Sequence, residues 1–301
     1  MTPNFRFVLF AALAAISLQA RADLSVVACE PEWASLATEL GGDKLKVTST
    51  TTALQDPHHI EARPSLIARM RGADLLVCTG MELEVGWLPV LLQQSANPKL
   101  APGAPGNFEA GRFIVPLDVP ARLDRSDGDV HAAGNPHIQL DPRNILKVAA
   151  ALSARLAQID AANASLYQDR FRAFSGRWGE AMRKWEQQAQ PLRGLPVVAR
   201  HKNMNYLWSW LGVREVATLE PKPGVEPNGG QLSQLKAQLA VQPAKMVVRG
   251  AYEDPRASRW LSEQAGIPDV VLPFTVGGND RATDLFGLFD STLSLLLAAA
   301  K

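Results

Sequence analysis

Short apolar runs alternate with longer amphipathic stretches along most of the chain. In the first half, runs typical of buried strands lie at residues 24–29, 46–50, 73–78 and 112–116. In the second half, similar runs lie at residues 195–200, 215–219, 245–249 and 269–272. Strands that alternate with helical patterns are typical of parallel α/β architecture.

The stretches between these runs have helical periodicity. We expect helices at residues 32–40, 64–71, 84–94, 204–211, 230–241, 256–264 and 282–300. Pro64 and Ser65 resemble a helix start, and Glu82 and Glu84 are expected to open the next helix, where carboxylates favour the positive end of the dipole.

Residues 143–190 form one long helical pattern without proline. We expect it to divide near Asp160 and to leave a second helix at residues 160–190, about 45 Å long at 1.5 Å per residue. The pattern therefore predicts two parallel-sheet α/β lobes, residues 23–159 and 191–301, joined by a rigid linker helix with a ligand cleft between them. Residues 97–134 are rich in proline and glycine, and a loop of this length is usually functional or mobile.

The N-terminus has the features of a secretory signal. Arg6 precedes an apolar run of residues 7–18, and Ala20 and Ala22 are the small residues that a signal peptidase reads. We therefore expect a signal peptide at residues 1–22, cleavage near Ala22-Asp23 and a periplasmic mature protein. Two alternatives are lipidation of Cys29 and a buried N-terminal helix.

Export would place Cys29 and Cys78 in an oxidising compartment. Each cysteine ends a predicted strand, so a disulfide is possible if the two strands are neighbours. Two buried thiols fit the sequence equally well.

Composition narrows the function classes. The 301 residues are 47% hydrophobic and 20% charged, as in ordinary globular proteins, which excludes a disordered chain. Thirty-one basic residues against thirty acidic ones leave a net charge of +1, so we expect no nucleic-acid partner. The mature chain is expected to be a monomer.

The chain contains five histidines, and all of them follow predicted strands or long loops: His58, His59, His131, His137 and His201. In parallel sheets, ligands bind beyond the carboxyl ends of the strands, so histidines of both lobes can converge on one cleft. Neutral imidazole is the commonest metal donor, and three such donors suit zinc.

Three segments carry a more specific resemblance. Residues 56–65 read DPHHIEARPS, residues 73–84 read ADLLVCTGMELE, and residues 135–142 read NPHIQLDP. With the segment that follows His201, they resemble the periplasmic zinc/manganese-binding proteins of metal ABC importers over nearly the whole mature chain. That resemblance implies two α/β lobes bridged by a helix, a solute-binding protein rather than an enzyme, and an importer permease as membrane partner.

The resemblance also implies His58, His137 and His201 as metal ligands. Members that bind manganese commonly have a carboxylate at the third position, so His201 favours Zn²⁺ over Mn²⁺ as the bound ion. The family supplies an aspartate just after the last strand as fourth ligand, whereas residues 271–280 read VLPFTVGGND here. Asp280 is the expected fourth ligand, and His59 or water is the alternative.

His131 is extra to the family pattern. One hypothesis is that it captures metal transiently on a mobile loop with Asp124, Asp127 and Asp129; the other is that it is solvent-exposed near the mouth of the cleft.

The sequence thus predicts a periplasmic solute-binding protein that captures Zn²⁺ between two lobes and delivers it to an ABC importer permease. One alternative is a zinc hydrolase that uses the same histidines with Glu61 or Asp280 as general base. Another is a surface interaction protein that needs no metal.

Overall fold

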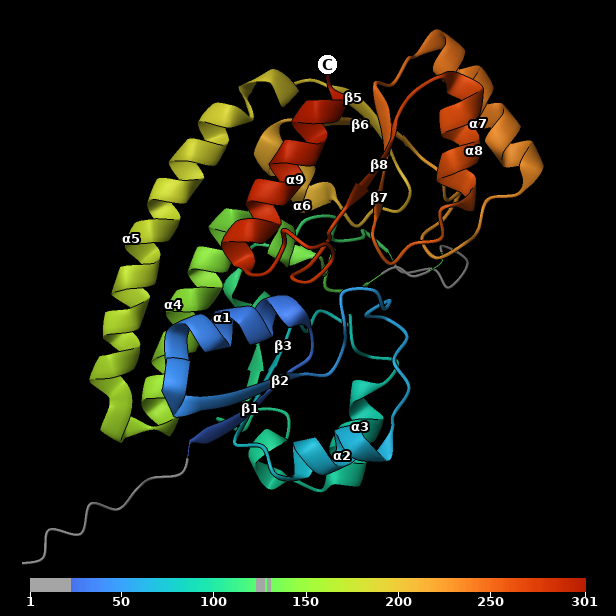
Figure 1. Ribbon diagram of the computed structural model, residues 1–301. Coiled ribbons are helices and arrows are strands. Elements are labelled where there is room, and N and C mark those ends of the chain that lie inside the picture. Colours follow the sequence, from blue (N-terminus) through green and yellow to red (C-terminus); the bar gives the residue numbers. More distant parts are fainter. Residues whose placement is uncertain (1–22, 123–127, 129–130) are drawn as a thin grey trace, which may run out of the picture.

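A computed structural model describes residues 23–122, 128 and 131–301 of the chain (Figure 1). The predicted signal peptide, residues 1–22, lies outside this range, and so do Asp124, Asp127 and Asp129. Within the described range, no helix combines the length and the apolar character that crossing a bilayer requires.

Two four-stranded parallel sheets form the two lobes (Figure 1). The order in the first sheet is β2-β1-β3-β4, and its strands are β1 (Leu24–Ala28), β2 (Leu45–Ser49), β3 (Leu75–Cys78) and β4 (Asn107–Glu109). The order in the second sheet is β6-β5-β7-β8, and its strands are β5 (Pro196–Ala199), β6 (Arg214–Thr218), β7 (Met246–Gly250) and β8 (Asp269–Leu272). The two-lobe α/β fold is confirmed.

Helices cover both faces of each sheet, because neighbouring residues of a strand point to opposite faces. In the first lobe, Val26 packs in the cluster that contains α1 (Pro31–Gly41), whereas Val27 packs with α2 (Pro64–Arg71) and α3 (Leu88–Ser95). In the second lobe, Val197 faces the cluster that contains α6 (Asn205–Leu211) and α9 (Leu285–Ala299). Val198 packs with α7 (Gly229–Val241) and α8 (Arg256–Ala265).

Two long helices, α4 (Pro142–Ile159) and α5 (Ala164–Gln188), pack against each other, and α5 runs beside both lobes (Figure 1). Arg177 of α5 pairs with Glu39 of α1, and the Trp185 indole nitrogen donates to Asp290 Oδ1 of α9 at 2.8 Å. A single helix thus contacts both halves of the molecule. The division of the chain at residues 159/160 and 190/191 stays a prediction.

Two elements lie at other residues than the sequence predicted. No strand forms at residues 112–116; β4 lies at Asn107–Glu109, because Phe108 is buried against the sheet whereas Val115 is 77% exposed. The helix expected at residues 84–94 begins at Leu88, so Glu84 does not open it. Glu84 is buried and accepts the backbone N–H of Thr79 at 2.7 Å, and residues 81–87 form turns.

Cys29 and Cys78 form a disulfide. Their strands, β1 and β3, are direct parallel neighbours, and the pairing of Ala28 with Val77 places the next residues side by side. The disulfide alternative is therefore the one that the structure shows.

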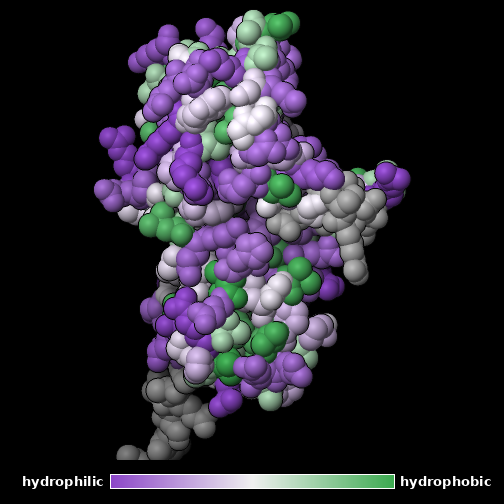
Figure 2. All heavy atoms as spheres, turned by 90° about the vertical axis from the view of Figure 1, so that its right-hand side faces the viewer, coloured by the Kyte–Doolittle hydropathy of each residue, from purple (hydrophilic) through white to green (hydrophobic). Residues whose placement is uncertain are grey.

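Hydrophilic side chains dominate the upper, C-terminal lobe in the face shown in Figure 2, and hydrophobic ones gather mainly on the lower lobe. Large apolar side chains exposed in this N-terminal lobe include Leu54 and Val85. On this face, the two lobes therefore differ in the polarity of their surface.

Candidate metal centre

Three of the predicted site residues, His58, His137 and His201, come together between the lobes. Their ring centres are 5.4 Å apart for His58 and His137, 6.0 Å for His137 and His201, and 6.4 Å for His58 and His201. Two imidazoles on one tetrahedral zinc ion have ring centres about 5.2 Å apart, given Zn–N bonds of about 2.0–2.1 Å. The observed separations lie close to this value and slightly above it.

The rings are near one another without being fully converged. Across the part of the chain that the structure describes, one group of three possible metal ligands has its atoms within 4.8 Å of one another: Cys29, Cys78 and Glu84. Both sulfurs of this group belong to the disulfide. The three histidines do not meet that distance. To share one ion, they must approach by rotation of the rings or by a small lobe movement.

His58 lies in the turn that follows β2, directly after Pro57. Its Nδ1 is 2.7 Å from Asp56 Oδ1, which also accepts the backbone N–H of His58 at 2.9 Å. Burial raises the pKa of Asp56, but the hydrogen bond and charge of His58 outweigh it, and that pKa is lowered. Trp87 donates to the Pro57 carbonyl at 2.8 Å and holds the turn in place. The His58 Nε2 atom is buried and makes no hydrogen bond, so it is the atom suited to bind a metal.

His137 precedes a 3₁₀ turn, η5 (Ile138–Leu140), and is 2% exposed. Burial, together with the charges of His58 and His201, lowers its pKa well below the usual value. The ring is therefore neutral at neutral pH, which metal binding requires. Its Nδ1 is buried without a hydrogen-bond partner.

His201 lies just beyond β5, in the second lobe. Its Nδ1 is 2.6 Å from Glu220 Oε2, a residue that follows the neighbouring strand β6. Burial lowers the pKa of His201, but the hydrogen bond and charge of Glu220 prevail and raise it. As at His58, a carboxylate holds one ring nitrogen and orients the other.

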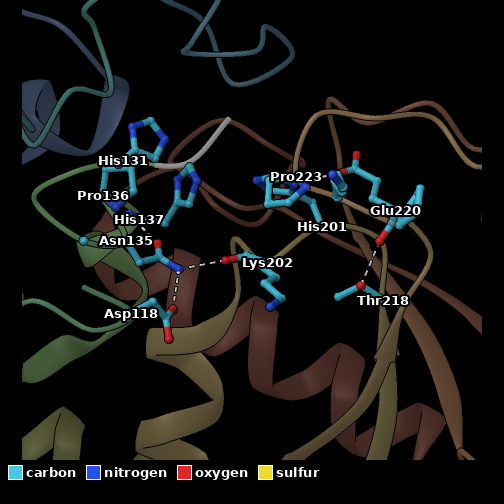
Figure 3. Close-up of a pocket in the computed structure, with 13 residues that line it drawn as sticks. Asp118, His131, Asn135, Pro136, His137, His201, Lys202, Thr218, Glu220 and Pro223 are labelled. Carbon is cyan, nitrogen blue, oxygen red and sulfur yellow. Dashed lines mark hydrogen bonds and ion pairs between the residues drawn. The ribbon is translucent and has the colours of Figure 1, made fainter. Parts of the chain in front are cut away.

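A cavity of about 440 Å³ opens beside these rings (Figure 3). Figure 3 shows His131 and His137 on one side of this cavity and His201 on the other. Asn135 donates to Asp118 at 3.1 Å and to the Lys202 carbonyl at 2.8 Å, so a single amide joins the two walls. The cavity lies between the lobes, as the sequence predicted.

The structure does not bring Asp280 to the rings. Asp280 is exposed in the turn between β8 and α9 and does not line the cavity. Of the nearer residues in that turn, Phe274 places its ring 5.5 Å from His137, and the Thr275 hydroxyl donates to Glu32. Asp280 as a metal ligand stays a prediction.

The other two histidines differ in their surroundings. The ring of His131 is 5.3 Å from that of His58, and His131 lines the cavity. His59 is exposed, with its ring 6.2 Å from that of His58. Of these two, His131 is the one placed at the site.

Sequence reasoning missed the carboxylates that orient the rings. Asp56 stands in the motif two residues before His58, a position from which it can reach the same ring. For Glu220, the sequence offers only one indication of this role. Glu220 follows β6, and β6 pairs with β5, the strand that precedes His201. The partner of a histidine in another loop becomes visible only when the order of the strands is known.

The family described as "ZnuA: Zinc-uptake complex component A periplasmic" matches residues 26–299. The zinc-binding lipoprotein AdcA of Streptococcus pneumoniae serotype 4 is 23% identical over 272 residues, which are 86% of this chain and 52% of that protein. The chain thus spans about half the length of AdcA. The manganese ABC transporter substrate-binding lipoprotein PsaA of Streptococcus pneumoniae is 24% identical over 263 residues, 84% of this chain and 80% of PsaA.

Solved structures agree on the fold. The crystal structure of ZnuA superposes with a TM-score of 0.75 at 20% identity and covers 91% of this chain and 99% of that one. The solute-binding protein FpvC of Pseudomonas aeruginosa, in complex with Mn²⁺, gives a TM-score of 0.75 at 21% identity, with 92% and 98% covered. Proteins with this fold thus include some named for zinc and some named for manganese.

Proposed function

Because the chain belongs to the family of periplasmic zinc-uptake components, we propose that it captures Zn²⁺ between its lobes and delivers the ion to an ABC importer permease. The family consists of solute-binding proteins of metal importers, which are not enzymes. The two residues considered as a general base for hydrolysis are poorly placed for that role. The Glu61 side chain is 84% exposed, and Asp280 does not line the cavity.

The observation that carries the proposal is the set of three imidazoles that two lobes bring within 5.4–6.4 Å of one another. Two of the rings are oriented by carboxylates, and the third is neutral because of its burial. Metal binding requires neutral imidazoles, so the affinity of such a set for a divalent cation should fall as pH drops.

Zinc is the ion that this donor set favours. Relatives are named for zinc, manganese or iron, so the family alone leaves the ion open. Imidazole nitrogen suits Zn²⁺, whereas Mn²⁺ prefers carboxylate and other oxygen donors. His201 supplies nitrogen at the position where manganese-binding members commonly have a carboxylate.

Delivery follows from the origin of the ligands. His58 and His137 belong to the first lobe and His201 to the second, so separating the lobes by a small tilt removes one of the three imidazoles. We propose that contact with the permease favours this tilt and releases the ion. The proposal places the mature chain, cleaved near Ala22-Asp23, in the periplasm as a monomer.

Competitive metal titration of the purified chain, with elemental analysis, tests this function. We expect one Zn²⁺ per chain, a clear preference over Mn²⁺, and loss of tight binding in His58→Ala, His137→Ala and His201→Ala. His59→Ala is the matched control, since His59 is exposed beside the site. A wild-type chain that retains no zinc, or a His137→Ala variant that binds as tightly, would contradict the proposal.

A further inference from the structure

The three imidazoles leave one position of a tetrahedral zinc site to be filled. The carboxylates nearest to the rings, Asp56 and Glu220, are already bonded to Nδ1 atoms. In the turn after β8, Phe274 offers no donor atom and the Thr275 hydroxyl is bonded to Glu32. Asp280 lies outside the cavity. No residue of the turn from which the family takes its fourth ligand lines this cavity.

His131 is a further imidazole beside these three rings. Its ring centre lies 5.3 Å from that of His58, nearer than either His137 or His201 is to His58. It lines the same cavity as His137 and His201 (Figure 3). The separation from His58 is close to the roughly 5.2 Å of two imidazoles on one tetrahedral zinc ion.

The segment that carries His131 is held by specific contacts. The next backbone N–H, that of Ala132, donates to Glu82 at 2.5 Å, and the Gly134 N–H donates to the His131 carbonyl at 3.1 Å. Asn135 then donates its backbone N–H to the Leu117 carbonyl at 2.8 Å. These bonds fix the chain that follows His131, from Ala132 to Asn135.

We propose that His131 is the fourth ligand, so that the metal is held by four imidazoles: His58, His131, His137 and His201. This inference rests on the proposed zinc function and names the donor that completes its site. The rings of His58 and His131 are inclined by 26°, so His131 must turn about its side-chain torsions to direct a nitrogen at the shared ion.

The donor set has a consequence for specificity. Four neutral nitrogens suit Zn²⁺ and offer nothing to ions that prefer oxygen, such as Mn²⁺. Because no ligand carries charge, the carboxylates of Asp56 and Glu220 behind the rings supply the negative charge that balances the ion. His131 thus adds to the preference for zinc over manganese that His201 already favours.

Zinc titration against a competing chelator, with X-ray absorption at the zinc edge, tests this assignment. We expect His131→Ala to weaken zinc binding about tenfold or more and to replace one of four imidazoles by an oxygen donor. His59→Ala and Asp280→Asn are matched controls that should bind like the wild type, and circular dichroism checks that each variant is folded. We expect His131→Asp to bind zinc more tightly than His131→Ala and to show a smaller preference for Zn²⁺ over Mn²⁺.

The outcomes separate this inference from the function on which it rests. If His131→Ala keeps the wild-type affinity while His58→Ala, His137→Ala and His201→Ala lose it, His131 is not a ligand and the zinc function stands. If Asp280→Asn weakens binding and His131→Ala does not, Asp280 is the fourth ligand instead. If the wild type binds no zinc, both proposals fail together.

Discussion

At the scale of single residues, the site depends on pairs of a histidine and a carboxylate. Glu220 accepts from one nitrogen of His201, and Asp56 does the same for His58. Each pair fixes which ring nitrogen faces the cavity and makes that nitrogen a better donor. The partner carboxylates therefore contribute to affinity without touching the ion.

Removing the charge of Glu220 tests this role. We expect Glu220→Gln to weaken zinc binding about 10–100-fold, because the amide orients His201 less firmly and polarises it less. The measurement is competitive zinc titration, with the exposed Glu263→Gln of α8 as control. Unchanged affinity in Glu220→Gln would show that this carboxylate does not support the ligand.

A second set of buried carboxylates affects how stability depends on pH. Burial raises the pKa of Glu84 to about 7, although hydrogen bonds from Glu30 and from the backbone of Thr79 lower it. The pKa of Glu30 is raised well above its usual value by burial and then by the charge of Glu84. Because the folded state holds protons here that the unfolded state releases above about pH 4.5, stability falls as pH rises from about 4.5 to 7.

Glu84→Gln should reduce this pH dependence, because it removes one of the buried titrating carboxylates and the charge that acts on Glu30. We expect the fall in melting temperature between pH 5 and pH 8 to be smaller in Glu84→Gln than in wild type. Glu180→Gln, at an exposed position of α5, should keep the wild-type profile. Parallel profiles for all three proteins would disprove the assignment to Glu84.

At the scale of elements, the disulfide joins two central strands, β1 and β3. It closes a loop between residues 49 positions apart and so restricts the unfolded chain. We expect the double variant Cys29→Ser, Cys78→Ser to lose about 2–4 kcal/mol of unfolding free energy. Urea denaturation measures the loss, and equal stability of the reduced and oxidised wild type would argue against the bridge as a stabilising element.

The elements also show what the sequence can reveal. The helix expected at residues 64–71 and the strand at 269–272 have the predicted bounds, because proline marks the helix start and a short apolar run marks the buried strand. The strand at 112–116 is wrong, because β4 is an edge strand whose single buried side chain, Phe108, gives no alternating pattern. The three clustered histidines were predictable from local motifs, whereas the approach of His131 to His58 depends on contacts between distant segments.

At the scale of the whole molecule, α5 limits how far the lobes can move. Its buried face, with Phe174, Trp178 and Trp185, packs in the core that both lobes share, and its ends contact α1 and α9. A wide hinge would expose these rings. The lobes are therefore expected to tilt slightly rather than to rotate apart.

Small-angle scattering checks this expectation. The profiles of metal-free and zinc-loaded protein should superpose closely, since only the rings and the cavity loops need to approach the ion. A marked decrease in the radius of gyration on zinc binding would mean a large domain closure. It would contradict the expectation that α5 limits the movement of the lobes.

The central claim is that side chains from two lobes share one metal ion. A crystal structure of the zinc-loaded chain, with anomalous diffraction data at the zinc edge, measures this directly. The account predicts one strong anomalous peak per chain, about 2.0–2.1 Å from nitrogens of His58, His137 and His201. A peak bound by only one lobe, or located away from these three rings, would contradict it.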